Sequence, residues 1–328
     1  MEERLDAEPR GKGRPSSAVA FAPDIACMGV SINRDGVDAE LWYPASGRRE
    51  RAERRLDVSE DPVPTALESL SSLLEANPGT RALCVGVAFP GEIDSSRRNV
   101  LSSVHFPEFH DRPVAMEFAE ALGLDAPVFV ERNAVCDMAS MVMRDSASED
   151  VLLVSLHSGV SAAVLIDRQI LYGKSGNIGE LGHLRHPESS VPCACGRVGC
   201  METLVGWLAW ERMFKRLSRE LGKPRKSFDE AIAEGDPDAM ELLLGSAHAL
   251  FPPLENLCIL LKPGKVVFST NLPPSARSAF ATAVERRLAN AVPKSDRPKV
   301  EALSEYSTVD GAAAIGMFWL SGHPQYAG

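Results

Sequence analysis

Three cysteines lie within eight residues of this chain, and that cluster constrains its fold more than any other feature of the sequence. Cys193, Cys195 and Cys200 follow the spacing C-x-C-x4-C, with Gly196 and Gly199 between them. Glycine permits the backbone of a tight turn, so the three thiolates can meet at one point. Clustered thiols without a C-x-x-C pair favour metal binding over redox chemistry, and a loop with incidental cysteines is the alternative.

A tetrahedral zinc site needs a fourth ligand. His183 lies ten residues before Cys193 and would complete a Cys3His site, whereas His186, which precedes a proline, is the rival. The chain has seven cysteines, an odd number that argues against a disulfide framework. The other four stand singly in apolar stretches, where a reduced cysteine packs as a small hydrophobic side chain: Cys27, Cys84, Cys136 and Cys258.

Length, composition and charge set the class of protein. A chain of 328 residues with 45% hydrophobic and 24% charged residues can bury a large core, and its length predicts two lobes. The net charge of −10 argues against a broad basic surface for nucleic acid, and the compact basic run is limited to Arg10, Lys12 and Arg14. No apolar run approaches the roughly 18 residues of a membrane span, and the charged N-terminus does not resemble a signal peptide. We therefore predict a cytoplasmic protein without a membrane partner.

Strand-like and helix-like stretches alternate along the chain. Residues 25–44 have the pattern of a β-hairpin that turns at Asp35-Gly36, and residues 81–91 that of a buried strand ending in a Pro-Gly turn. The order fits two halves of the type βββαβα and predicts an α/β protein with a cleft between two lobes. The other expected strands are 127–133, 150–173 and 265–270, and the expected helices are 64–77, 113–124, 134–144, 202–221, 227–261, 273–292 and 308–322.

Five segments resemble, in the same order, the ROK family (repressor, open reading frame, kinase) from about Met28 onward. The most specific is a Gly-Glu-x-Gly-His turn that ends at His183, followed by C-x-C-G-x-x-G-C-x-E. The resemblance implies an actin-like ATPase fold of the hexokinase/ROK type, a zinc held by the histidine and three cysteines, and a sugar in the cleft between the lobes. It also implies a homodimer or a tetramer. The segments are 85–94, 127–134, 156–183, 193–202 and 310–316.

The resemblance divides the chain into lobes and a leader. We expect residues 24–134 with 305–328 to form a smaller lobe, and 135–304 a larger lobe with the zinc-binding loop 183–200. Residues 1–23 are similar to the remnant of a wing and its Gly-Arg-Pro linker, which in repressors of the family follow a winged helix-turn-helix. A charged leader of no consequence is the alternative. DNA binding is expected only if the full protein has a reader domain at its N-terminus.

Six residues match positions of the family that surround the sugar. Glu180 and Glu202 match glutamates that bond sugar hydroxyls, and carboxylates suit that task because they accept charge-assisted hydrogen bonds. Turn capping by Glu180 and a helix start at Glu202 are the alternative. His183 would give one ring nitrogen to zinc and the other to a sugar hydroxyl. The remaining positions are Gly91, His105, where the family commonly has asparagine, and Asn133.

The segments that would transfer phosphate depart from the family pattern. The family's catalytic aspartate aligns with Asn133, and an amide cannot accept the proton of a sugar hydroxyl. The two phosphate loops have lost most of their glycines and the acid that faces the metal. ATP and Mg²⁺ are therefore not expected as cofactors. The degenerate positions are Ser31–Asp35, Ser158 beside the surviving Gly159, and Thr270 and Asn271 near the adenine site.

These matches and departures predict a non-catalytic, sugar-sensing regulator of the transcriptional type. One alternative is an ATP-dependent sugar kinase, similar to glucokinase or N-acetylhexosamine kinase, with atypical motifs. The other is a zinc-stabilised scaffold without a ligand. Arg132, which replaces an asparagine beside the base position, would together with a His105 cation favour an acidic or phosphorylated sugar. A solvated arginine on a lobe surface is the alternative for Arg132.

Overall fold

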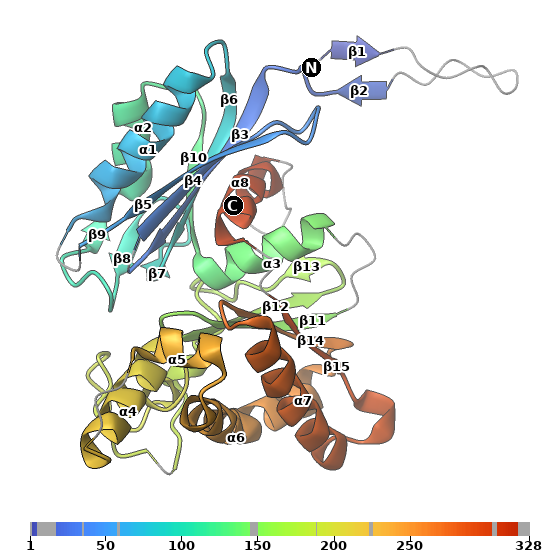
Figure 1. Cartoon of the computed structure of the whole chain (residues 1–328). Coiled ribbons are helices and arrows are strands. Elements are labelled where there is room, and N and C mark those ends of the chain that lie inside the picture. Colours follow the sequence, from blue (N-terminus) through green and yellow to red (C-terminus); the bar gives the residue numbers. More distant parts are fainter. Residues whose placement is uncertain are drawn as a thin grey trace, which may run out of the picture.

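Two five-stranded sheets with helices on both faces form the structure, a computed structural model shown in Figure 1. The predicted turn residue Asp35, most of the expected leader and the chain end 321–328 lie outside the residues that it describes. Of the leader, β1 (Glu2–Arg4) and β2 (Ala18–Ala20) pair antiparallel. The described residues are 2–4, 18–34, 36–57, 60–144, 150–187, 189–222, 226–303 and 307–320.

The first sheet has the strand order β10-β6-β3-β4-β5. β3 (Ile25–Asn33) pairs antiparallel with β4 (Gly36–Trp42), which pairs antiparallel with β5 (Arg49–Arg55). β6 (Arg81–Phe89) and β10 (Val128–Arg132) join on the other side of β3 as parallel strands. β3 is buried along almost its whole length, as expected for a central strand with helices on both faces.

The outer face of the first sheet carries two helices. α1 (Pro62–Ala76) and α2 (Val114–Leu122) lie side by side on it (Figure 1). A small three-stranded sheet, β7 (Glu92–Ile93), β8 (Val100–Ser102) and β9 (His110–Arg112), follows β6. Together these elements bury an apolar core on the outer side of the first sheet.

The second sheet repeats the topology of the first. Its order is β13-β12-β11-β14-β15, again with two antiparallel pairs followed by two parallel pairs. The prediction of two similar α/β halves is thereby confirmed, but each half has the order βββαβαβα, with one strand and one helical segment more than the expected βββαβα. The strands are β11 (Val151–Leu156), β12 (Val160–Ile166), β13 (Gln169–Ile170), β14 (Lys265–Thr270) and β15 (Lys299–Leu303).

Residues 150–173 form three strands, which corrects the single strand expected there. The turn between β12 and β13 consists of Asp167 and Arg168, which both adopt positive φ angles of 51° and 62°. Two such residues in succession form the kind of two-residue turn that closes an antiparallel hairpin. Neither residue is a glycine, so the usual sequence signal of this turn is absent.

The helical stretches of the second half also begin and end differently from the prediction. The expected helix 202–221 is α4 (Trp207–Glu220), which begins only after Gly206 with φ of 99°. The expected helix 227–261 is broken at Gly235, whose φ of 75° ends α5 (Phe228–Glu234). Asp236 then caps the next helix, and α7 (Pro274–Ala291) lies in the predicted place.

α6 (Pro237–Leu261) is long and apolar enough to cross a membrane by length and composition. This corrects the expectation that no apolar run approaches the length of a span. Leu243, Leu250 and Leu254 are fully buried, however, in the core between α6 and the second sheet. α6 therefore has the buried apolar face that is typical of a helix in a protein core.

α3 (Asn133–Arg144) and α8 (Thr308–Leu320) lie between the two sheets (Figure 1). Glycines let α8 approach its neighbours at backbone distance. A Cβ atom on Gly86 of β6 would lie 1.8 Å from the carbonyl oxygen of Ala312 in α8, and one on Gly311 would lie 1.7 Å from the carbonyl oxygen of Cys136 in α3. Only glycine fits at such positions.

Candidate functional site

Four side chains from the loop after β13 gather at one point. The ligand atoms of His183, Cys193, Cys195 and Cys200 all lie within 4.8 Å of one another. Cys195 Sγ is 3.7 Å from Cys200 Sγ, and Cys193 Sγ is 3.8 Å from His183 Nδ1. Zinc–sulfur bonds of about 2.3 Å at tetrahedral angles place two sulfurs roughly 3.8 Å apart. The four residues could therefore hold one zinc ion, and among the described residues His183, not His186, completes the group.

The thiols of this cluster differ in acidity. Burial raises the pKa of Cys193 to about 12. Burial acts in the same direction on Cys195, but hydrogen bonding with Arg197 outweighs it and lowers the pKa of Cys195 to about 6. Cys195 therefore supplies a thiolate at neutral pH, and a divalent cation would draw the other thiols into the ionised form.

A cleft of about 420 Å³ opens beside the cluster and is lined by both halves of the chain. The first half contributes the segment after β6, and the second contributes the loop between β11 and β12 and the cysteine loop. The six residues predicted to contact a sugar all line this cleft: Gly91, His105, Asn133, Glu180, His183 and Glu202. Of the degenerate phosphate-loop positions, Asn33, Arg34, Ser158 and Gly159 line it, whereas Ser31, Thr270 and Asn271 are not among its lining residues.

Polar contacts connect the cysteine cluster to one side of the cleft. His183 Nδ1 faces Cys193, whereas His183 Nε2 lies 3.8 Å from Glu180 Oε2. Glu180 Oε1 in turn lies 3.5 Å from Arg132 Nη1. The two ring nitrogens of His183 thus face in the two directions that were predicted, one toward the metal ligands and one into the cleft.

On the other side, Glu202 links the cluster to the degenerate second phosphate loop. Its Oε1 lies 3.8 Å from Cys193 Sγ, and its Oε2 accepts a hydrogen bond from the Val160 N–H at 3.4 Å. A Cβ atom on Gly159 would come within 2.5 Å of Glu202 Oε2. A carboxylate therefore lies against the glycine and the backbone amide that would otherwise face a phosphate.

Asn133 is the first residue of α3 and points toward the first loop. Its Nδ2 donates to the carbonyl oxygen of Ile32 at 3.3 Å and to Asn33 Oδ1 at 3.1 Å. In the neighbouring loop, His157 Nε2 lies 3.2 Å from Ser269 Oγ and 3.5 Å from Asp137 Oδ2. These amide, imidazole and hydroxyl groups occupy the region where the family resemblance places the base and the phosphate loops.

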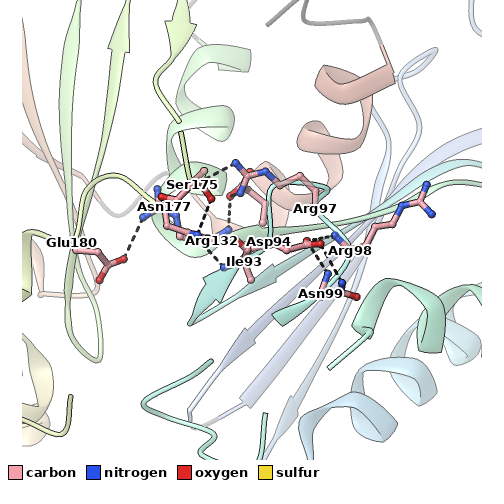
Figure 2. A network of polar contacts seen from close by, with 11 residues as sticks. Ile93, Asp94, Arg97, Arg98, Asn99, Arg132, Ser175, Asn177 and Glu180 are labelled. Atoms are coloured by element: carbon pink, nitrogen blue, oxygen red, sulfur yellow. Dashed lines mark hydrogen bonds and ion pairs between the residues drawn. The ribbon is translucent and has the colours of Figure 1, made fainter. Parts of the chain in front are cut away.

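A loop from the second half is fastened to the first half next to this site. Asn177 Nδ2 donates to the Ile93 carbonyl at 2.7 Å, and Asn177 Oδ1 accepts from the Ile93 N–H at 3.0 Å (Figure 2). Arg97 Nη2 donates to the Gly176 carbonyl at 3.1 Å, and its guanidinium lies 4.6 Å from the ring centroid of Tyr172. These hydrogen bonds fix the loop around Asn177 to the first half, and Glu180, three residues further on, lines the cleft.

Sequence reasoning did not identify four residues that shape the site. Two of them carried a usable signal, because Arg197 lies inside the cysteine motif and Asn177 just before the Gly-Glu-x-Gly-His turn. Glu92 follows the Pro-Gly turn and lines the cleft. Arg97 carried no signal, because its partners are distant in the chain.

Comparison with known proteins identifies relatives of two kinds. The ROK family profile matches residues 36–323. The DNA-binding transcriptional dual regulator NagC of Escherichia coli is 27% identical over 180 residues, which cover 52% of this chain and 44% of that protein. A glucokinase of Thermotoga maritima is 27% identical over 144 residues, which cover 44% of this chain and 45% of the enzyme. The chain thus matches about half the length of these curated relatives.

Solved structures show the same fold. A ROK family transcriptional regulator, described as a homolog of the E. coli MLC protein, superposes with a TM-score of 0.73 at 22% identity and covers 90% of this chain and 78% of its own. A ROK family glucokinase from Streptomyces griseus, in complex with glucose and AMPPNP, gives a TM-score of 0.73 at 19% identity and covers 88% of this chain and 98% of its own. Since the family profile extends over most of the chain and its two sheets form the actin-like ATPase fold of these neighbours, the protein belongs to the ROK family.

Proposed function

We propose that this chain is a non-catalytic sensor that binds a sugar or a sugar derivative in its cleft, as the effector-binding part of a transcriptional regulator. The observation that carries the proposal is Asn133, an amide at the position that the family resemblance gives to the catalytic aspartate. Its Nδ2 acts as a donor to Ile32 and Asn33. An amide can bind a sugar hydroxyl but cannot take its proton.

The state of the second phosphate loop supports the same proposal. Glu202 Oε2 lies at the Val160 amide and against Gly159. Phosphoryl transfer depends on backbone amides that approach the phosphates, and of the glycines in the family's Gly-Thr-Gly-x-Gly loop this chain keeps Gly159 alone. Glu202 is well placed instead to accept hydrogen bonds from the hydroxyl groups of a sugar in the cleft.

The ROK kinases among the relatives are the reason to test catalysis directly. Wild-type protein, incubated with ATP, Mg²⁺ and each of a panel of hexoses and N-acetylhexosamines, should release no ADP. A thermal-shift screen of the same sugars should show stabilisation by at least one of them, since a ligand that binds only the folded chain raises its melting temperature. ADP release with any of these sugars would establish a kinase instead. A panel without a single stabilising sugar would favour the scaffold.

Zinc binding by His183, Cys193, Cys195 and Cys200 is part of this proposal. A closed tetrahedral site of this kind is structural and adds its binding energy to folding. Cys200→Ser should lower both the zinc content, from about one per chain, and the free energy of unfolding. Cys258→Ser, which changes a buried cysteine outside the cluster, should leave the zinc content unchanged. Zinc-free wild-type protein of full stability would remove the site.

The oligomeric state and DNA binding that we propose are inferred from the regulatory role, and they do not rest on residues of the cleft. We propose a homodimer or tetramer in the cytoplasm, as the family resemblance implies. The curated relative NagC is named as DNA-binding, and the matched segments cover 44% of its length. DNA contact therefore belongs to the proposal only together with a DNA-reading domain in the full protein.

A further inference from the structure

Arg132 is a buried cation at the floor of the cleft. It is the last residue of β10 and directly precedes α3, and its side chain is 5% exposed. Its Nη1 meets Glu180 Oε1 at 3.5 Å, the outer limit of a hydrogen bond (Figure 2). Its Nε and Nη2 atoms have no hydrogen-bond partner among the described residues. A buried guanidinium in this state has an uncompensated desolvation cost.

The carboxylates near Arg132 do not neutralise it. Glu131 is fully buried, but its Oε1 accepts from Arg97 Nη1 at 3.3 Å as well as from the backbone N–H of Arg132 at 2.8 Å. The contact with the guanidinium of Arg97 thus occupies this carboxylate, and Arg132 reaches it through its backbone N–H. Burial also raises the pKa of Glu131, although Arg97 and Arg132 oppose that shift. Glu180 is 42% exposed, and solvent weakens its attraction to Arg132.

The helix that begins beside Arg132 adds to the positive potential. α3 has 12 residues, and its first residue, Asn133, lines the cleft. The N-terminus of a helix carries a partial positive charge, which favours anions and disfavours a cation such as Arg132. An anionic group placed between Arg132 and the start of α3 would satisfy both.

We propose that the sugar bound in this cleft carries a negatively charged substituent, a phosphate or a carboxylate, and that Arg132 binds that group. The inference rests on the proposed sugar-binding function and specifies the class of ligand. Nε and Nη2 form one edge of the planar guanidinium, which matches two oxygens of a phosphate or carboxylate. Nε and Nη2 are buried, so a rotation of Arg132 that separates it from the half-exposed Glu180 would present that edge to a ligand. Glu180, released from Arg132, remains for the sugar hydroxyls together with His183 and Glu202.

Calorimetric titration of the full chain with matched ligands tests the inference. The pairs are glucose with glucose 6-phosphate, glucose with glucuronate, and N-acetylglucosamine with its 6-phosphate, and inorganic phosphate serves as an anion without a sugar. At least one anionic sugar should bind roughly 10- to 100-fold more tightly than its neutral partner, since a hydrogen bond to a charged group contributes that much. Comparison of the phosphate and carboxylate pairs identifies the anion.

Three variants assign the preference to Arg132. Arg132→Met removes the charge at similar volume and should abolish the preference, and Arg132→Lys keeps the charge without the planar edge and should retain part of it. Arg216→Met removes an equal charge from an exposed position on α4 and should leave the preference intact. Binding of a neutral sugar by Arg132→Met, with unchanged affinity, would show that the variant is folded.

The other outcomes separate this inference from the proposed function. If wild-type protein binds the neutral member of each pair as tightly as the anionic one, the inference is wrong and sugar sensing stands. If no sugar binds, neutral or anionic, the proposed function fails and the inference with it. Inorganic phosphate that binds as tightly as the best sugar phosphate would overturn recognition of a substituted sugar.

Discussion

Buried charge is arranged in opposite ways at the two ends of α3. At the C-terminal end, two fully buried carboxylates, Glu40 and Asp310, are surrounded by three partly exposed arginines. Arg51 Nε lies 2.6 Å from Glu40 Oε2, and Arg144, the last residue of α3, donates to Asp310. Arg49 contacts both acids. Every carboxylate oxygen therefore has a guanidinium partner.

At the N-terminal end the pattern is inverted. A cation, Arg132, is buried, and its side-chain partner among the described residues, Glu180, is half exposed. The helix dipole strengthens the contrast, because it favours Arg144 in the last turn and disfavours a cation before the first turn. The comparison indicates that the first cluster is complete within the protein, whereas the second lacks a negative charge that a ligand would supply.

The largest expected effect is at the complete cluster. Asp310 contacts all three arginines, whereas Glu40 contacts Arg49 and Arg51. Asp310→Asn would therefore leave Arg144 without its carboxylate partner, and loss of this buried carboxylate, discounted for the partial exposure of the arginines, should cost about 2–3 kcal/mol of unfolding free energy. Urea denaturation at pH 7 measures this loss. Asp24→Asn is the control, since Asp24 forms an exposed pair with Arg81, and solvent leaves such a pair little effect on stability. Equal losses in both variants would mean that burial does not distinguish the pairs.

The second effect concerns the exposed partner at the other end. Glu180→Gln keeps the shape of the side chain but removes charge-assisted bonds to hydroxyls, so ligand affinity should fall by roughly 1.5–3 kcal/mol. The stability of the ligand-free protein should change little. Calorimetry with the best sugar of the screen measures the affinity, and Glu220→Gln on the exposed face of α4 is the control. Unchanged affinity would place the sugar elsewhere.

The third prediction is a gain in the free energy of unfolding, in contrast to the loss expected for Asp310→Asn. Arg132→Met replaces an uncompensated buried charge with an apolar side chain of similar size, so the free energy of unfolding of the ligand-free protein should rise, by about 1 kcal/mol. The same urea experiment measures it next to Asp310→Asn. A clear loss of stability would show that Glu131 and Glu180 compensate Arg132 after all.

The smallest expected change in stability concerns Glu40. It tests whether the cluster at the C-terminal end of α3 needs both of its buried carboxylates. Burial and the neighbouring Asp310 raise the pKa of Glu40 above its ordinary value of 4.5, against the effect of Arg49 and Arg51. A carboxyl whose pKa is raised in the folded state stabilises it at low pH, and that contribution is lost as the pH rises through the raised value. Glu40→Gln should therefore be slightly more stable than wild type at pH 7.

The pH dependence checks this sign. The advantage of Glu40→Gln should disappear as the pH falls through the raised pKa of Glu40 toward 4.5, because wild-type protein then carries a proton at the same place. Denaturation curves at several pH values between these limits measure the difference. An advantage that grows toward low pH would contradict the raised pKa.

Local patterns in the sequence predicted the parts of the molecule that depend on near neighbours. The cluster of one histidine and three cysteines was predictable because its four members lie between His183 and Cys200. The central strands were predictable because apolar residues fill them. β5 was missed, since its sequence from Arg49 to Arg55 is charged almost throughout. The structure explains this strand, because Arg49 and Arg51 lie two residues apart on one face and both contact the buried Glu40.

Pairs that are distant in sequence explain the remaining failures. Arg51 and Asp310 are 259 residues apart, and nothing local to either residue indicates the other. Arg132 was identified from the sequence as a departure from the family pattern, but its burial and its contact with Glu180, 48 residues later in the chain, were not predictable. The family motif thus indicated that this position had changed. The burial and the neighbours of the new side chain depend on how the two halves of the chain pack together.

The glycines at the contacts of α8 determine which parts of the protein can move past one another, because α3 and α8 lie between the two sheets. Gly86 and Gly311 bring α8 into backbone contact with the first sheet and with α3, whereas α3 meets β11 and β12 of the second sheet through side chains such as Met138. Interdigitated side chains permit small shear displacements, and backbone contacts at this distance do not. Closure of the cleft around a ligand would therefore carry the first sheet, α8 and α3 as one rigid block across the second sheet.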